Sequence, residues 1–208
     1  AGLMAGCGAS STTADTSCAE NTLVLTLAHG LSETHTVHIA MTQFADEVAE
    51  KTDGRIQVKI FPNGQLGSEN ENLEQLQAGV IAMTKVSAPG LATYNDAFNT
   101  FGLPYIFNDT DDFYHVMDSQ EMQDFFLSTG DDGFVTLTYY TSGARSFYTK
   151  DRAIRTPADL KGLKIRVQDM KSQTDMMSYL GGIPVAMSYG DVYTSLQTGI
   201  IDAVSYTH

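Results

Sequence analysis

Basic residues are scarce in this chain of 208 residues, which has 12 lysines and arginines against 25 aspartates and glutamates. The formal net charge of −13 argues against nucleic-acid binding, because no basic stripe is available to meet phosphates. The sequence also lacks any run of about 18 or more apolar residues, the length that a membrane-spanning helix requires. An acidic protein that binds an anion needs a local cluster of cations. The basic side chains are therefore more informative about function than they would be in a protein of balanced charge.

The motifs that mark common enzyme classes are also missing. The sequence contains no Gly-x-Ser-x-Gly nucleophile elbow, no phosphate-binding glycine loop and no Rossmann fingerprint. Three neighbouring histidines, His29, His35 and His38, lack the spacing of a His-Glu-x-x-His zinc pair, and no cysteine cluster accompanies them. We therefore expect a protein that is not an enzyme and that holds no cofactor and no metal.

The first residues indicate export. Residues 3–7 have the pattern of a bacterial lipoprotein cleavage box, in which small residues precede a cysteine, here Cys7, that receives the lipid. Because only six residues precede Cys7, the apolar part of a signal peptide is expected to be missing. Residues 1–21 would then be a signal remnant and a flexible tether rich in Ser, Thr and Ala, which holds the protein outside the cytoplasm. A Cys7–Cys18 disulfide is the alternative, and Cys18 otherwise has no role.

Hydrophobic periodicity predicts the same order of elements, β-α-β-α-β, in two successive parts of the chain. In the first part, Ser68 and Glu71 have the spacing of a capping box, which marks the start of the second helix. The three strands of this part are expected at residues 23–28, 56–60 and 80–86. Further along, helices are expected at residues 111–117 and 120–127, with a β-rich run at 134–140.

In the second part, residues 163–167 alternate apolar and polar side chains with the period of a strand. A helix closed by the glycines at 181–182 follows, and then a short strand. Ser188 and Asp191 have capping-box spacing at the start of the next helix, which Gly199 ends. Alternation of strands and helices predicts a parallel sheet, with a ligand at the carboxyl ends of the strands.

The two parts also repeat a short motif. Residues 76–81 and 196–201 both read Leu-Gln-x-Gly, followed by two aliphatic residues, at the same point of the element order. This match favours two similar lobes that face a cleft. We define lobe I as residues 22–141 and lobe II as residues 142–208, with the boundary near residues 141–143.

Several of these motifs occur in the same order in a known protein family. They are Phe-Ala-Asp-Glu-Val at 44–48, GRIQVKIFPNGQLGSE at 54–69, EQLQAG at 74–79, LPYIF at 103–107, KGLKIRV at 161–167, LGGIPVAM at 180–187 and DVYTSLQTGIID at 191–202. On these motifs the chain resembles the solute-binding proteins of tripartite ATP-independent periplasmic (TRAP) transporters. The resemblance implies an α/β fold of the type II periplasmic binding proteins, two-lobed, with the ligand in the cleft. It also implies that the lobes close on a small organic acid by hinge motion and deliver it to TRAP membrane subunits.

The resemblance further implies that Arg166 and Arg145 bind the ligand. In the family, arginines at both positions point into the cleft, and the one at the position of Arg166 grips the ligand carboxylate. Arginine suits this role, because its planar fork matches a carboxylate in a way that lysine cannot reproduce. From spacing alone, each arginine could instead pair with a neighbouring aspartate.

Four more ligand contacts are implied at positions that match the family: His29, Glu69, Ser87 and Tyr189. For each of these, the alternative is ordinary loop polarity or core packing. A glutamate beside an anion is expected only if the ligand also carries an amine or a hydroxyl group.

The last residues depart from the family pattern. Where the family usually reads Asp-Gly-x-Glu-Asn, this chain has Asp202-Ala203-Val204-Ser205-Tyr206, so the asparagine contact is not carried over to Tyr206. Residues 204–208 resemble translated adapter sequence, and a divergent terminus is the alternative. We expect lobe II to be incomplete, with an uncovered apolar face on its sheet. The functional alternative is the extracytoplasmic ligand-sensing domain of a signalling protein with the same fold.

Overall fold

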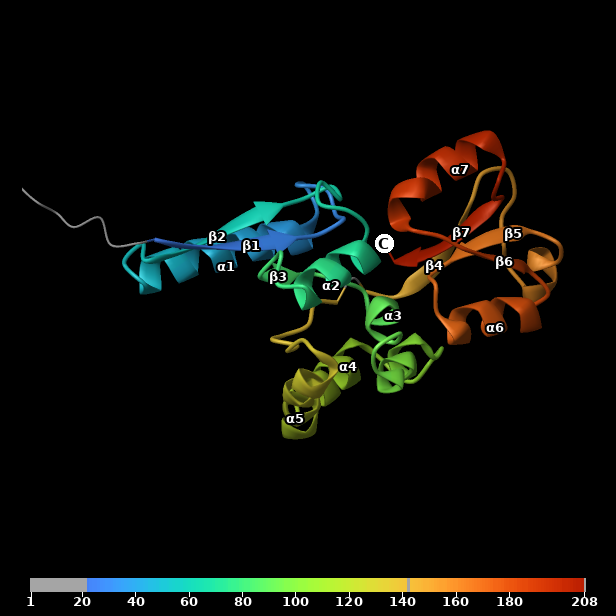
Figure 1. The fold of residues 1–208 in the computed structure, drawn as a ribbon. Helices are drawn as coiled ribbons and strands as arrows, with labels where there is room; N and C mark the ends of the chain where they lie inside the picture. Colours follow the sequence, from blue (N-terminus) through green and yellow to red (C-terminus); the bar gives the residue numbers. More distant parts are fainter. Residues whose placement is uncertain (1–21, 142, 208) are drawn as a thin grey trace, which may run out of the picture.

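The computed structural model describes residues 22–141 and 143–207. These residues form two α/β lobes, each built on its own sheet (Figure 1). None of the helices within the described ranges is long and apolar enough to cross a bilayer. The predicted lipid attachment at Cys7 and the alternative disulfide to Cys18 lie outside these ranges.

Lobe I is built on a parallel sheet of order β2-β1-β3. Helix α1 packs against this sheet through Val37 and Met41, which are four residues apart and therefore lie on one helix face. The elements of lobe I are β1 (Leu23–Ala28), α1 (Thr36–Lys51), β2 (Ile56–Phe61), α2 (Glu69–Gln77), β3 (Met83–Thr84), α3 (Ala88–Leu91), η1 (Asp96–Gly102), α4 (Thr110–Met117), α5 (Gln120–Ser128) and η2 (Thr129–Asp132).

Lobe II is built on a four-stranded sheet of order β4-β7-β5-β6, in which only β4 runs antiparallel to its neighbour. Its elements are β4 (Arg145–Thr149), η3 (Pro157–Leu160), β5 (Lys164–Val167), α6 (Lys171–Tyr179), β6 (Ile183–Ala186), η4 (Tyr189–Asp191), α7 (Val192–Thr198) and β7 (Ala203–Thr207).

Both faces of the lobe II sheet are packed. Ala203 belongs to one apolar cluster, which includes Met177 of α6, and its neighbour Val204 belongs to another, which includes Val192 of α7. Successive residues of a strand point to opposite faces, so the two clusters cover opposite sides of the sheet. The expectation that one apolar face of the lobe II sheet is uncovered is therefore wrong.

Unfilled apolar space lies in lobe I instead. A cavity of about 550 Å³ is lined by residues of β3, by aromatic residues of η1 and of the later helices, and by residues 133–140. Its lining includes Met83, Phe98 and Phe134 but few polar groups. The cavity also reaches Lys85, which directly follows β3.

The repeated motif forms the same turn in both lobes. Gly79 and Gly199 end α2 and α7 with positive φ angles of 71° and 74°, a conformation that glycine adopts without steric cost. The isoleucine two residues later, Ile81 or Ile201, is buried in each copy. The motif thus returns the chain from the helix to the core in the same way twice.

Three expected elements differ from the structure. The strand expected at 80–86 is reduced to β3, because the N–H groups of residues 80 and 81 bond to Gln75 in the turn after α2. Residues 134–140 form no strand, and the Thr136 N–H donates to the Thr129 hydroxyl instead. Ser188 precedes the short helix η4 without a side-chain capping bond, so the predicted box does not form.

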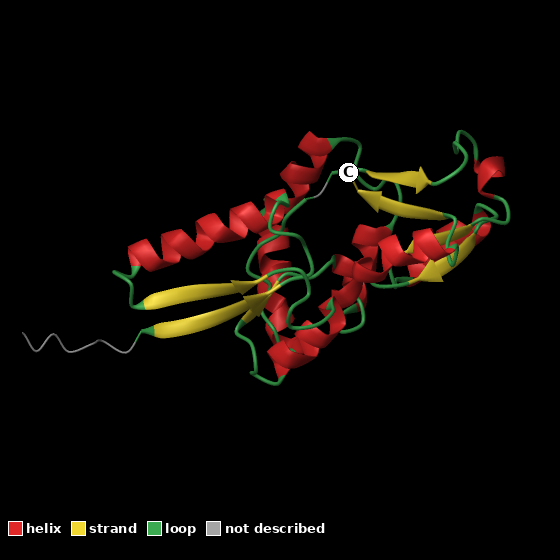
Figure 2. Cartoon of the chain, turned by 90° about the horizontal axis from the view of Figure 1, so that it is seen from above, coloured by secondary structure: helices red, strands yellow, loops and turns green. Residues whose placement is uncertain are grey.

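The carboxyl ends of strands from the two sheets face each other. In Figure 1 the carboxyl ends of β1 and β2 are directed toward lobe II, and β7 ends on the side of lobe II that faces lobe I. Viewed from above, the sheets lie at opposite ends of the molecule with helices between them (Figure 2). The strand ends of both lobes therefore converge on the middle of the molecule.

Helix α6 of lobe II contacts η1 of lobe I directly. The Gln173 side-chain amide donates to the Gly102 carbonyl at 2.8 Å, and both residues are buried. A Cβ atom at position 102 would lie 1.9 Å from the Met170 sulfur. Only glycine permits this close approach without displacing Met170.

Candidate ligand-binding site

Arg166 lies in the interior of lobe II. It belongs to β5, an inner strand of the sheet, and only 4% of the residue is exposed. Its Nε donates to the Met187 carbonyl at 3.0 Å, while its Nη1 is buried and has no hydrogen-bond partner among residues 22–141 and 143–207. Because buried polar groups are nearly always hydrogen-bonded, this nitrogen is suited to bind an acceptor from outside the chain.

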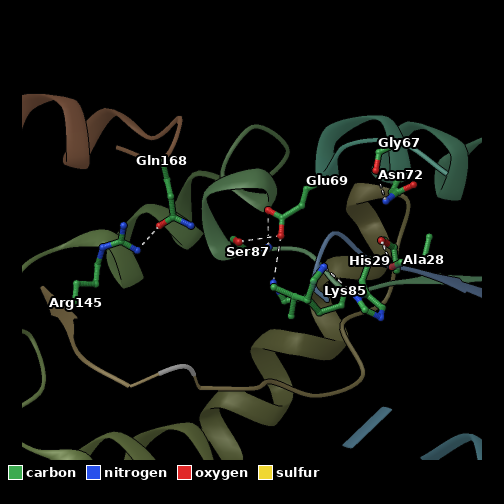
Figure 3. Close-up of polar contacts among 11 residues, drawn as sticks. Ala28, His29, Gly67, Glu69, Asn72, Lys85, Ser87, Arg145 and Gln168 are labelled. Carbon is green, nitrogen blue, oxygen red and sulfur yellow. Dashed lines mark hydrogen bonds and ion pairs between the residues drawn. The ribbon is translucent and has the colours of Figure 1, made fainter. Parts of the chain in front are cut away.

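Arg145 begins β4 and is held in place by three hydrogen bonds. Its Nε and Nη2 donate to the side chain and carbonyl of Ser205, at 3.3 and 2.5 Å. Its Nη1 donates to Gln168 Oε1 at 2.8 Å (Figure 3). The guanidinium is therefore fixed before any ligand binds.

The two guanidinium groups form a positive site in an acidic protein. Burial, together with the charge of Arg166, lowers the pKa of Arg145 to about 10. Burial also lowers the pKa of Arg166, while nearby Tyr206, Glu69 and Tyr189 act in the opposite direction. Both side chains remain charged at neutral pH.

Neither arginine forms an ion pair with any residue in the described part of the chain. The pairing with a neighbouring aspartate that spacing alone allowed is therefore absent there.

Glu69 carries the opposite charge on the lobe I side. Its Oε1 accepts from Lys85 Nζ at 3.2 Å and from the Ser87 hydroxyl at 3.0 Å, and its Oε2 accepts from the Ser87 N–H at 3.1 Å (Figure 3). Ser68 caps α2 together with Glu71, as the sequence predicted, and this fixes the helix start where Glu69 sits. The structure therefore brings Glu69 and Ser87 into direct contact.

His29 follows β1 and is fully buried. Its Nδ1 accepts the Leu31 N–H at 3.1 Å, and its Nε2 lies 3.0 Å from His38 Nδ1. Burial, together with the charges of His38, Lys85 and His35, lowers the pKa of His29 to about 4. At neutral pH His29 is therefore uncharged and orders the loop after β1.

The other nearby histidine, His35, has a structural part at the start of α1, where its Nδ1 accepts the N–H of Val37. Among residues 22–141 and 143–207, no group of three or more His, Cys, Asp or Glu side chains is arranged to hold a metal ion.

Tyr189 stacks on Tyr206 beside Arg166. The ring centroids are 4.8 Å apart and the planes differ by 17°. Tyr189 is half exposed, whereas burial raises the pKa of Tyr206. Sequence reasoning excluded Tyr206 because it departs from the family asparagine, but the fold places its ring next to the buried arginine.

Sequence reasoning also missed Lys85 and Gln168. Lys85 directly follows β3 and pairs with Glu69, and Gln168 directly follows β5 and holds Arg145. Polar residues that come immediately after a parallel strand reach the edge where ligands bind, so this position was the available signal.

Comparison with known proteins assigns the family. The family model for bacterial extracellular solute-binding proteins, family 7, matches residues 27–208. The chain belongs to this family. A relative from Salmonella typhimurium, an uncharacterized protein, is 42% identical over 164 residues, which are 78% of this chain and 50% of the relative. The C4-dicarboxylate-binding periplasmic protein of Rhodobacter capsulatus is 33% identical, over 76% of this chain and 47% of that protein.

Solved structures of TRAP solute-binding proteins share the fold. One from Anaerococcus prevotii, with bound D-glucuronate, has a TM-score of 0.85 and is 37% identical in sequence. The match covers 88% of this chain and 60% of the Anaerococcus chain. One from a Sulfitobacter species, with bound β-D-galacturonate, has a TM-score of 0.83 and is 32% identical in sequence. That match covers 88% of this chain and 61% of the Sulfitobacter chain. The expected two-lobed α/β fold is confirmed. The chain spans about half the length of the family 7 relatives described above.

Proposed function

We propose that this chain is the ligand-binding part of an extracytoplasmic solute receptor of a TRAP transporter, and that its ligand is an organic acid. The observation that carries the proposal is the buried Nη1 of Arg166, which has no hydrogen-bond partner in the part of the chain that the structure describes. An unpaired buried cation is costly, and a carboxylate would supply the missing charge and acceptor.

The other predicted site residues have supporting roles in this proposal. Arg145 adds positive charge beside Arg166 and is kept in position by Gln168. Glu69 and Ser87 present polar groups from lobe I, and Tyr189 presents an aromatic face. His29 shapes the loop behind them from its buried position, without carrying charge.

The motion that we propose is a hinge closure of the two lobes on the ligand, followed by delivery to TRAP membrane subunits. Ligands in the solved relatives are consistent with an organic acid, since D-glucuronate and β-D-galacturonate both carry a carboxylate. Lipid anchoring through Cys7 stays a prediction. The alternative of a signalling sensor domain gains no support from the relatives named above, which include a C4-dicarboxylate-binding periplasmic protein and TRAP solute-binding proteins.

A thermal-shift screen of organic acids on the full-length protein tests the proposal. Ligand at about 100 times its dissociation constant should add about 2.7 kcal/mol to the free energy of unfolding. The screen should include C4-dicarboxylates, keto acids, sugar acids and sulfonates, with neutral sugars as the control. If every acid leaves the melting temperature unchanged, the proposed function is wrong.

A further inference from the structure

Within the described residues, η1 and α6 form the most extensive contact between an element of lobe I and an element of lobe II. The contact lies to one side of the facing strand ends. In Figure 1, α6 lies below the lobe II sheet, next to the green segment of lobe I that follows α3. A contact on one side of two facing lobes can serve as the pivot of their rotation.

Each side of this contact is anchored in the core of its own lobe. In η1, Phe98 is buried, and its ring centroid lies 5.0 Å from that of Phe125 in α5. In α6, Met177 is fully buried in the apolar cluster that packs on the lobe II sheet. Because packed cores deform little, η1 and α6 follow their own lobes in a domain motion.

The contact is costly to separate. The side-chain amide of Gln173 donates to the Gly102 carbonyl at 2.8 Å, and both residues are buried. Pulling the two helices apart would break this bond and would bring water to Met170, which is buried beside Gly102. The contact should therefore persist in any motion that has a cheaper alternative.

The strand ends lack such a tie. None of the ion pairs among the described residues joins one lobe to the other. On the lobe II side, Arg166 donates to Met187, and on the lobe I side, Glu69 accepts from Lys85 and Ser87. Each of these bonds stays within one lobe. The strand ends can therefore approach or part without breaking them.

We propose that the η1–α6 contact is the fixed pivot of the hinge motion, so that Gln173 and Gly102 stay paired in both the open and the closed form. The chain provides a second fixed point where it passes from η2 of lobe I to β4 of lobe II. Two rigid bodies tied at two points can turn only about the line that joins those points. This inference rests on the proposed function and locates the axis of its hinge motion.

A disulfide across the pivot tests the inference in the full-length protein. A Cβ atom at position 102 would lie 2.6 Å from Ser172 Oγ and 1.9 Å from the Met170 sulfur. Cysteines at positions 102 and 172 are therefore close enough for a disulfide, whose Cβ atoms are about 3.5–4.5 Å apart. The variant combines Gly102→Cys and Ser172→Cys with Met170→Ala, which makes room for the new side chain. Peptide mapping by mass spectrometry identifies the bond, and the reduced form of the same protein is the matched control.

Calorimetry and small-angle X-ray scattering with D-glucuronate compare the two forms. The oxidised protein should bind within about 3-fold of the reduced protein, because a fixed pivot leaves the closed form accessible. Its radius of gyration should fall on binding, as in the reduced protein. A loss of about 10-fold or more in affinity on oxidation would mean that the contact must open before the lobes can close, and would overturn the inference. So would a radius of gyration that responds to D-glucuronate only in the reduced form.

Hydrogen exchange in the wild type gives a second test, which decides even if the variant does not fold. Binding of D-glucuronate should change amide exchange in η1 by less than about 2-fold, while exchange in the loop after β1, residues 29–35, should slow by about 10-fold or more. A change in η1 as large as that in the loop would overturn the pivot.

The outcomes separate this inference from the proposed function. If D-glucuronate does not bind, the acid that binds most tightly in the screen takes its place. Failure of the pivot with an acid that binds leaves an organic-acid receptor in place. If every acid in the screen fails to bind, the proposed function is wrong and the pivot falls with it.

Discussion

Replacing Arg166 with alanine should separate ligand binding from stability. Within the described part of the ligand-free protein, this side chain donates a hydrogen bond to the Met187 carbonyl and forms no ion pair. Loss of one such bond and relief of an unpaired buried charge act in opposite directions on the free energy of unfolding. The melting temperature of the ligand-free variant should therefore change little.

Binding should respond much more strongly. A hydrogen bond to a charged group contributes about 1.5–3 kcal/mol, and a carboxylate on Arg166 would lose one or two of these bonds. At about 1.4 kcal/mol per decade, Arg166→Ala should weaken binding by roughly 100-fold. Ligand at about 100 times the wild-type dissociation constant would then stabilise the variant by only about 0.4 kcal/mol, compared with about 2.7 kcal/mol for the wild type. Arg166→Lys keeps the charge but not the planar fork, and its affinity should fall between the two.

Calorimetry and thermal shift with D-glucuronate on the full-length protein would measure both quantities. Arg152→Ala is the matched control, because Arg152 is an exposed arginine of the same lobe whose Nη2 donates to the Asp159 carbonyl. It should bind like the wild type. Equal losses for Arg152→Ala and Arg166→Ala would show only a general electrostatic effect. Wild-type affinity in Arg166→Ala would remove this residue from the site.

Three further predictions concern stability and are measured by urea denaturation. The protein should lose stability as the pH falls from about 6.5 toward about 4, because the pKa of His29 is about 4 when folded and the unfolded chain takes up the proton first. His29→Asn should flatten this decline, and an equal slope in both proteins would contradict the assignment. Gly102→Ala should cost about 1–3 kcal/mol by forcing Met170 aside, and adding Met170→Ala should recover part of that loss. If the stability losses of Gly102→Ala and Met170→Ala simply add in the double variant, the close contact between positions 102 and 170 is not the cause of the loss. Ser68→Ala should cost about 0.5–2 kcal/mol through loss of the α2 cap, and an unchanged midpoint would show that the cap contributes nothing.

Local patterns in the sequence were sufficient to predict much of the fold. The strand at 23–28, the capping box at Ser68 and the glycine turn at Gly199 all formed as predicted. These features depend on side-chain alternation, on one capping bond or on one backbone angle, and each is decided within a few neighbouring residues. Arg166 could be singled out for the same reason, since it stands within a short and specific motif.

Contacts between distant residues could not be predicted in this way. Lys85 meets Glu69 across 16 positions, and Gln168 meets Arg145 across 23. Tyr206 was set aside because it departs from the family asparagine, and its place beside Arg166 depends on the pairing of β7 with β5. The sequence by itself determined which charges are present and where several of the strands lie, among them those at 23–28 and 164–167. Only the tertiary structure decided which arginine nitrogen stays unpaired, because that depends on every acceptor that the rest of the fold brings within about 3 Å.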